Sequence, residues 1–332
     1  MTRSGAIDAV RVLGVAAVVA GHTLATPLVR PLFYSWHVPL FFFLAGYFWS
    51  AQRPFMVELK ARTRTLVRPY ASWWILIALV FVPLDATLET TTGARLLGPF
   101  FNGRHSALPY TTFWFVSALF ATVMLFRLLF LLPRPLVWAI AVGGSVLGYL
   151  AGDELAQTPF AIGSALPCLI FLVLGTIAHD LRPHIARPGL VGTVLLVGSA
   201  ALVASGISAP LDIKQGNYGT PGVSVLTASA ISFGLVLVAE SAFARLAVSR
   251  HSTLSPWLNV GATRLAYAGL TVVLLHPLVF WLMLRFAPPV PNWLLFVVTL
   301  TVPWLIGLAV LRTPASPWLT GVARVGRLSR RD

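Results

Sequence analysis

The sequence is poor in cysteine and in charged residues. Cys168 is the one cysteine among 332 residues and falls in an apolar run, which excludes a disulfide framework and a thiolate metal site. Charged residues make up 10% of the chain against 57% hydrophobic ones, and the mean hydropathy is +0.83, which excludes an ordinary soluble domain. The sequence also lacks a glycine-rich phosphate loop and an internal repeat. This composition predicts an all-α, polytopic integral membrane protein.

Apolar runs of about 20 residues, the length that crosses a bilayer as a helix, recur along the whole chain. We expect about ten transmembrane helices. The first run is not expected to be a cleaved signal peptide, because Asp8 and Arg11 interrupt it and further apolar runs follow. The predicted spans are 7–26, 32–50, 69–84, 112–132, 136–150, 160–178, 190–206, 223–243, 265–286 and 293–311.

The net charge of +14 comes from basic residues in the short segments between these spans. With the N-terminus in the cytoplasm, most of the 24 Lys and Arg residues fall on the cytoplasmic side, as the positive-inside rule requires. We therefore interpret the charge as a signal for orientation, expect no nucleic-acid partner, and place both termini in the cytoplasm. Residues 1–312 are predicted to form the transmembrane domain, and residues 313–332 a basic cytoplasmic tail suited to anionic membrane lipids. The basic residues left on the outer side are Arg30, Arg95, Arg104, Lys214 and Arg285.

Three ionisable residues lie within the first apolar run, namely Asp8, Arg11 and His22. On a helix with about 100° and 1.5 Å per residue, Arg11 and His22 share one face about 16 Å apart, and Asp8 lies on that face too. A bilayer penalises such groups by several kcal/mol, so this row of residues predicts a functional site. A neutral imidazole at His22 can take a proton from a hydroxyl near neutral pH, as general-base catalysis requires.

Two further histidines are predicted in the outer half of the membrane. His37 opens the second span beside Trp36, at a depth similar to that of His22, so we expect these two histidines to share one cavity. His276 precedes Pro277 in the ninth span. A structural hydrogen bond between helices explains His276 as well as a functional role does, and for His37 both interpretations remain open.

Basic residues gather in the segment 60–70, which is predicted as an inner loop leading into the third helix. Its four cations, with Pro69 at a helix start, favour a phosphate ligand, because guanidinium groups and free helix N–H groups both bind phosphate. A basic inner loop is also what the positive-inside rule demands. Trp114, at the start of the fourth span, is either part of an aromatic interface belt or part of a site.

Taken together, these motifs resemble the acyltransferase 3 family, and within it the fucose 4-O-acetylase-like branch. The resemblance covers nearly the whole ten-helix body, although its specific motifs lie in the first 120 residues. It is carried by Asp8-x-x-Arg11 with His22 after ten further residues, by Trp36-His37-Val-Pro39-Leu-Phe-Phe-Phe-Leu-Ala-Gly46-Tyr47-Phe48, by Arg64-x3-Arg68-Pro69-Tyr70, by Trp114-Phe115 and by Leu-Leu-His276-Pro277.

The resemblance implies transfer of an acyl group, usually acetyl, from cytoplasmic acyl-CoA to a hydroxyl of a glycan, glycolipid or other lipid-linked acceptor at the outer face. Acyl-CoA would be a donor co-substrate, with no tightly bound cofactor and no metal. The implied roles are His22 as general base or acyl carrier, Arg11 on the donor, Asp8 fixing Arg11, and His37 orienting His22 or stabilising an oxyanion. The residues implied to bind the donor phosphates are Arg62, Arg64, Arg68 and Tyr70. Those implied to bind the acceptor are Trp36, Trp114 and His276.

A transporter or flippase for a polar or lipid-linked substrate is the main alternative, because a row of polar residues through a helical body suits a transport path. A non-catalytic scaffold or receptor is a third class. Against transport, the sequence shows no two halves related by inverted hydropathy. The outer segments 85–111 and 205–220, the second of which contains Lys214, are expected to contact the acceptor. The preference for Arg over Lys is typical of bacteria with high-G+C genomes, so we expect a bacterial plasma membrane protein.

Overall fold

The chain folds into a bundle of helices. The computed structural model describes residues 4–86, 92–248 and 254–324. Within these ranges the only β pairing is a single bridge between Asp212 and Asn217. Seven helices are long and apolar enough to cross a membrane, and two shorter apolar helices, α6 (Phe113–Leu129) and α9 (Pro188–Ala204), have 17 residues each. The predicted all-α membrane architecture is confirmed, whereas the count of ten spans and the cytoplasmic termini stay predictions.

The long helices follow the apolar runs, because a helix satisfies its backbone hydrogen bonds internally and needs no water to do so. The remaining elements are α1 (Gly5–Thr23), η1 (Arg30–Tyr34), α2 (Pro39–Tyr47), α3 (Phe55–Arg62), η2 (Thr63–Val67), α4 (Arg68–Ala86), α5 (Thr92–Phe101), α7 (Arg134–Gln157), η3 (Pro159–Ser164), α8 (Ala165–Leu181), η4 (Arg182–His184), η5 (Ile213–Gln215), α10 (Val223–Val248), α11 (Leu254–Phe286), α12 (Asn292–Val310) and α13 (Ser316–Leu319).

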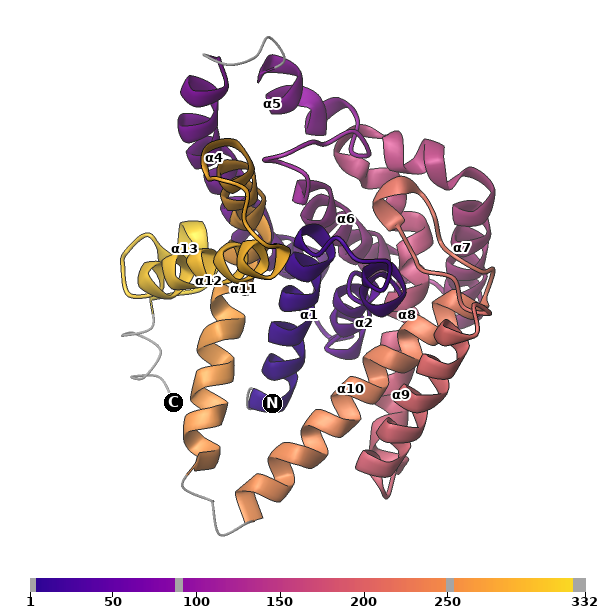
Figure 1. Ribbon diagram of the computed structural model, residues 1–332. Helices are drawn as coiled ribbons and strands as arrows, with labels where there is room; N and C mark the ends of the chain where they lie inside the picture. Colours follow the sequence, from indigo (N-terminus) through magenta and orange to yellow (C-terminus); the bar gives the residue numbers. More distant parts are fainter. Residues whose placement is uncertain (1–3, 87–91, 249–253, 325–332) are drawn as a thin grey trace.

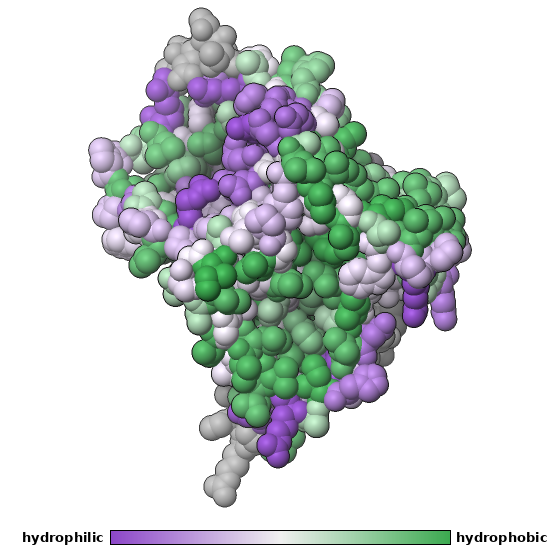
Figure 2. Space-filling model, turned by 90° about the vertical axis from the view of Figure 1, so that its right-hand side faces the viewer, coloured by the Kyte–Doolittle hydropathy of each residue, from purple (hydrophilic) through white to green (hydrophobic). Residues whose placement is uncertain are grey.

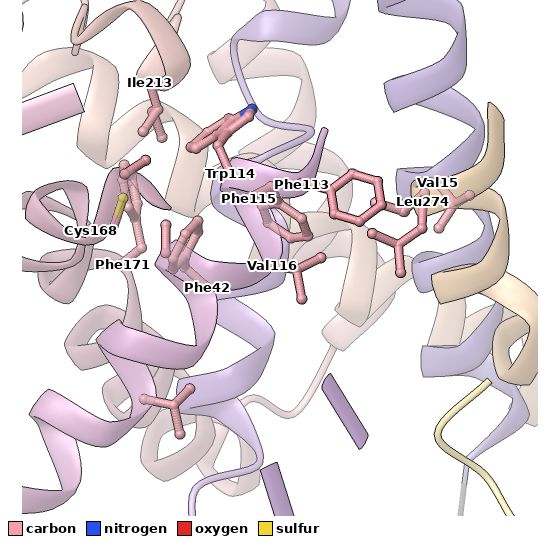
Figure 3. Packing of buried hydrophobic residues seen from close by; sticks show 14 of the residues in the cluster. Val15, Phe42, Phe113, Trp114, Phe115, Val116, Cys168, Phe171, Ile213 and Leu274 are labelled. Atoms are coloured by element: carbon pink, nitrogen blue, oxygen red, sulfur yellow. The ribbon is translucent and has the colours of Figure 1, made fainter. Parts of the chain in front are cut away.

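Helices α1 and α2 lie in the middle of the bundle, with α4, α11 and α12 on one side and α7 to α10 on the other (Figure 1). Helix α1 packs against α10, α11 and α12, and α2 packs against α8. In the core, Figure 3 shows Phe42, Cys168 and Phe171 on one side of the start of α6, and Val15 and Leu274 on the other. The first helix, with its ionisable residues, therefore lies within the bundle, with much of its surface packed against other helices.

Hydrophobic residues dominate the middle and lower part of one face of the molecule (Figure 2). Hydrophilic residues gather in the upper part of that face and at its lower end. An apolar band between polar ends is what a bilayer requires of the surface that it surrounds.

The second predicted span, 32–50, is divided in two. Its first part belongs to the π-helical turn η1, and α2 begins only at Pro39. Pro31 is the second residue of η1 and Pro39 is the first of α2. In the first turn of a helix the missing N–H costs nothing, so each proline favours a new helix start. The break places His37 in the turn between the two pieces, where its side chain is held by a local backbone contact.

Helix α2 crosses α8 at very close range. A Cβ atom on Gly46 would lie 1.8 Å from the carbonyl oxygen of Leu172, and one on Gly175 would lie 2.1 Å from that of Phe43. Only glycine permits this approach of two backbones, which is typical of helix pairs in membranes. The crossing fixes α2, and with it the turn that contains His37.

The third predicted span starts earlier than expected. The segment 60–70, predicted as an inner loop, is helical throughout, since α3, η2 and α4 follow one another without a break over 55–86. The amide of Arg68 bonds to the carbonyl of Thr63, so no free helix N–H groups are available before Pro69. The prediction of a helix start for phosphate binding there was wrong, because a π turn lets the helix continue past the proline.

The beginning of the predicted tail packs onto the helical body. The carbonyl of Leu319 accepts hydrogen bonds from Trp73 and Thr271, and Ser316 is fully buried. Residues 325–332 of the predicted tail lie outside the described residues. The boundary at residue 312 stays a prediction, and so does the binding of this tail to anionic lipid.

Candidate active site

At the N-terminal end of α1, Asp8 and Arg11 form the predicted ion pair. The Arg11 guanidinium donates to the Asp8 carboxylate over 2.7 Å, and Asp8 is fully buried. The same guanidinium lies 5.0 Å from the centre of the Phe48 ring, a cation–π contact that joins the end of α2 to α1. One turn of helix separates the two charged residues, so this pair follows directly from their spacing.

At the other end of α1, His22 contacts His276 of α11. The Nδ1 atom of His22 lies 2.9 Å from Nε2 of His276, and the two rings are nearly parallel at 16°. His276 is fully buried, and its Nδ1 atom lies 2.8 Å from the carbonyl oxygen of Val272, one turn earlier in α11. The sequence placed both histidines in the same half of the membrane, but their direct contact spans 254 residues and has no local signal.

His37 is held by its own turn. Its Nδ1 atom lies 2.6 Å from the carbonyl oxygen of Phe33, and its ring meets Tyr34 edge to face at 4.9 Å. Because a carbonyl can only accept, Nδ1 of His37 is the donor, and in the neutral ring Nε2 then carries a lone pair. A neutral His37 has no second N–H to offer an oxyanion.

His22 and His37 share one cavity of about 50 Å³, as predicted. The aromatic residue Trp114, at the start of α6, also lines it. The indole N–H of Trp114 makes no hydrogen bond with any residue that the structure describes, so it is available to a ligand. We call this space the histidine cavity; its lining is completed by Val18, Tyr34, Val38, Thr112, Phe115, Leu211, Asp212, Ile213, Lys214 and Val273.

The segment 205–220, which is expected to contact the acceptor, contributes Leu211, Asp212, Ile213 and Lys214 to the wall of the histidine cavity. Its contact with an acceptor stays a prediction. The Lys214 ammonium donates to the Ser106 carbonyl over 2.7 Å and to the Thr111 hydroxyl over 2.5 Å. Burial lowers the pKa of Lys214 to about 8, while the nearby Asp212 carboxylate acts in the opposite direction. Asp212 in turn pairs with Arg30 over 3.0 Å. The third N–H of the ammonium makes no hydrogen bond within the described residues, so Lys214 brings a hydrogen-bond donor and a positive charge to the cavity wall.

Arg11 is not among the residues that line the histidine cavity. Between Arg11 and His22 on α1, Val15 is buried in the core, and the side chains of Leu40 and Phe41 press against Gly14. A ligand that reached His22 from the Arg11 end would have to displace these apolar side chains. The row of ionisable residues is therefore present on α1, but packed side chains separate its two ends.

The basic segment 60–70 serves different purposes along its length. Arg62 donates to Glu58 over 2.6 Å. Glu58 is buried at 1% exposure and also pairs with Arg53 at 3.3 Å and with the buried Arg127 at 3.8 Å. We call Arg53, Glu58, Arg62 and Arg127 the Glu58 cluster. Sequence reasoning missed Glu58, although its position four residues before Arg62 is a standard spacing for an ion pair on a helix.

The other residues predicted to hold the donor differ in their contacts. Arg64 is exposed and pairs with no acidic residue in the described ranges, whereas Arg68 lies over the Trp318 ring at 5.0 Å. Tyr70 packs edge to face on Phe113. Of the predicted acceptor residues, Trp36 is buried away from the histidine cavity and gives its indole N–H to the Leu32 carbonyl. Their binding roles stay predictions.

A larger cavity of about 580 Å³ lies between the end of α2 and the helices α6, α7 and α8. Its polar lining comes from Arg134, His179 and Asp180, and its apolar walls include Trp49 and Phe126. It shares no lining residue with the histidine cavity. Among the described residues, no three His, Cys, Asp or Glu side chains lie together so as to hold a metal ion.

A comparison with protein families finds a match over residues 4–316 to the model described as an acyltransferase domain. No curated protein and no solved structure matches the chain. The matched region includes α1 to α12, and thus both ends of the row on α1 and the whole histidine cavity. The chain belongs to the acyltransferase 3 family.

Proposed function

We propose that the protein is a membrane O-acyltransferase. It moves an acyl group, most favourably acetyl, from cytoplasmic acyl-CoA to a hydroxyl of a glycan, glycolipid or similar acceptor outside a bacterial plasma membrane. The observation that carries this proposal is the position of His22 at the wall of a small cavity, in an apolar helical body that belongs to an acyltransferase family. A cavity of this size suits an acetyl group better than a long acyl chain.

In the proposed reaction, His22 takes the proton from the acceptor hydroxyl while the hydroxyl oxygen attacks the thioester carbonyl. The resulting tetrahedral oxyanion collapses, the carbon–sulfur bond breaks, and the CoA thiolate leaves and receives the proton from His22. The ester on the acceptor and CoA thiol are the products. The acyl group passes directly from donor to acceptor, so His22 needs to act as a base and not as an acyl carrier.

The oxyanion in this reaction needs donors, and two groups at the cavity wall supply them. They are the indole N–H of Trp114 and the ammonium of Lys214. Neutral His37 has given its N–H to Phe33, so its part in the reaction is to accept a hydrogen bond, for example from the acceptor hydroxyl.

Donor binding is proposed at the opposite end of α1. Arg64 is exposed and pairs with no acidic side chain in the described part of the chain, so it can bind a phosphate, and Arg11 remains the proposed contact to the donor arm next to Asp8. To bring the thioester to His22, the side chains of Leu40 and Phe41 beside Gly14 have to move apart when the donor binds.

The test uses purified protein in proteoliposomes with acetyl-CoA labelled in the acetyl group. The proposal expects labelled ester on a hydroxyl acceptor, such as envelope glycans or glycolipids added to the opposite side, together with release of CoA thiol. Movement of an unmodified lipid-linked substrate without any CoA release would instead support a flippase. Absence of both acetyl transfer and slow acetyl-CoA hydrolysis would contradict the proposal.

A further inference from the structure

The hydrogen bonds of His276 define which of its ring nitrogens carries a proton. Its Nδ1 atom lies 2.8 Å from the Val272 carbonyl oxygen, and a carbonyl oxygen can only accept. Nδ1 of His276 is therefore the donor. The ring is fully buried, and no carboxylate among the residues that the structure describes contacts it, so the neutral form is the stable one and its Nε2 atom carries a lone pair.

This lone pair defines the state of His22 in turn. The Nε2 atom of His276 lies 2.9 Å from Nδ1 of His22, and one of the two has to donate. Because Nε2 of His276 has no proton, Nδ1 of His22 carries one and donates it. In neutral His22 the second nitrogen, Nε2, is then the unprotonated one.

We propose that His276 is a positioning residue that holds His22 in the tautomer with its proton on Nδ1, so that Nε2 of His22 is the base. The tautomer follows from the hydrogen bonds alone, and only the use of Nε2 as a catalytic base rests on the proposed function. Val272, His276 and His22 thus form a chain of donors and acceptors that runs from the backbone of α11 to the reacting nitrogen of α1. His276 acts through His22 and does not need to touch the acceptor, unlike the substrate-binding role that the sequence predicts for it.

The arrangement also explains how His22 accepts a proton during the reaction. When Nε2 of His22 becomes protonated, Nδ1 keeps its proton and its hydrogen bond to His276, so the ring does not have to turn. The bond becomes charge-assisted at that moment and strengthens. The Val272 carbonyl and neutral His276 thereby do what a carboxylate does in many catalytic triads, namely orient the base and fix its tautomer.

The direct test is nitrogen NMR of the full chain in lipid nanodiscs, with histidine labelled at both ring nitrogens. The signals of His22 and His276 are assigned by their loss in His22→Asn and His276→Gln. The proposal predicts a protonated Nδ1 and an unprotonated Nε2 for each of the two residues in the wild-type protein. A protonated Nε2 on neutral His22 would overturn it, whether or not the protein transfers acyl groups.

A pair of variants tests the same proposal by kinetics. His276→Leu removes the acceptor for His22 and is expected to lower kcat by about 100-fold with little change in KM for acetyl-CoA. His276→Gln offers a side-chain oxygen near the former Nε2, which can accept a neutral hydrogen bond from His22. This variant is therefore expected to recover at least a tenth of the wild-type kcat. The melting temperature of both variants is measured first.

Equal activity of His276→Leu and wild type would overturn the positioning role. If both His276 variants unfold, the NMR signals of His22, assigned by their loss in His22→Asn, still decide the matter. If the wild-type protein shows the predicted tautomers but no acyl transfer, the proposed function fails while the hydrogen-bond chain stands.

Discussion

The two ends of α1 use ionisable residues in opposite ways. At the N-terminal end, Asp8 neutralises Arg11, and in the helix that contains the basic segment the Glu58 cluster gathers three arginines around one buried carboxylate. At the other end, His22, His37 and His276 bond to carbonyls or to one another, and a cavity remains beside them. The comparison shows that basic residues in a dense motif can form structural ion pairs that stabilise the fold. Of the few histidines at the other end, His22 and His37 each keep a ring nitrogen that can take part in a reaction.

The largest expected effect is on folding and comes from Glu58. Glu58→Gln leaves the buried Arg127 without its carboxylate, which is expected to cost about 3–5 kcal/mol of stability because an uncompensated buried charge remains. Thermal unfolding in detergent measures it. The control is Arg53→Gln, which removes an exposed partner of the same carboxylate and is expected to cost less than about 1 kcal/mol. Equal losses in the two variants would contradict the distinction.

The next largest effect is expected on kcat and comes from Lys214, where one substitution removes the charge at the histidine cavity and keeps the packing. Lys214→Met is expected to lower kcat by about 100-fold, because an oxyanion donor is lost while the apolar stem is kept. The unfolding temperature of the variant shows whether the bonds to Ser106 and Thr111 also matter for the fold. Wild-type kcat in a folded Lys214→Met protein would remove this residue from the mechanism.

The pH dependence has a defined sign. The pKa of Lys214 is lowered to about 8, so its ammonium is present below that pH and is lost as the pH rises through it. Activity is therefore expected to fall above pH 8. In Lys214→Arg, the falling limb moves to higher pH because a guanidinium stays charged. The other titratable groups that line the cavity are His22, Tyr34, His37 and Asp212, and an unshifted limb in Lys214→Arg would assign it to one of them.

A smaller effect is expected for donor binding at the basic segment. Arg64→Ala removes an exposed cation that pairs with no acidic residue in the described ranges. The loss of one charge-assisted hydrogen bond to the donor is expected to raise KM for acyl-CoA about tenfold, with no change in kcat. Arg134→Ala, in the larger cavity beside α7, is the matched comparison. A raised KM in Arg134→Ala alone would move the donor site to that cavity.

The smallest effect is expected for Trp114→Phe. The substitution keeps an aromatic ring at the cavity wall and removes the indole N–H. Because one neutral hydrogen bond to the oxyanion is lost, kcat is expected to fall about fivefold. Steady-state kinetics at saturating acyl-CoA measures this. An unchanged kcat would mean that Trp114 contributes shape and no hydrogen bond.

Local periodicity predicted much of this molecule, and long-range packing decided the rest. The ion pair of Asp8 with Arg11 follows from a three-residue step on one helix, and the cavity shared by His22 and His37 follows from the depth of two adjacent spans. The contact of His22 with His276 joins residues 254 positions apart, and only the packing of α1 on α11 creates it. Pro39 could have signalled the break in the second span, because proline favours a helix start.

The same limit explains the error at the basic segment. The polar residues at 60–70 predict a loop because they interrupt an apolar run. The helix continues through them because Arg62 finds Glu58 on its own helix and Arg127 reaches it from α6. Hydropathy marks where membrane contact ends, and it does not mark where a helix ends.

The most direct test of the central claim compares His22→Asn with the wild-type protein in the same nanodiscs, with labelled acetyl-CoA and one hydroxyl acceptor. The account predicts that the variant keeps the unfolding temperature of the wild type while its rate of acetyl transfer falls by at least about 100-fold. A folded His22→Asn protein that transfers acetyl at the wild-type rate would contradict the claim that the histidine cavity is where the chemistry takes place.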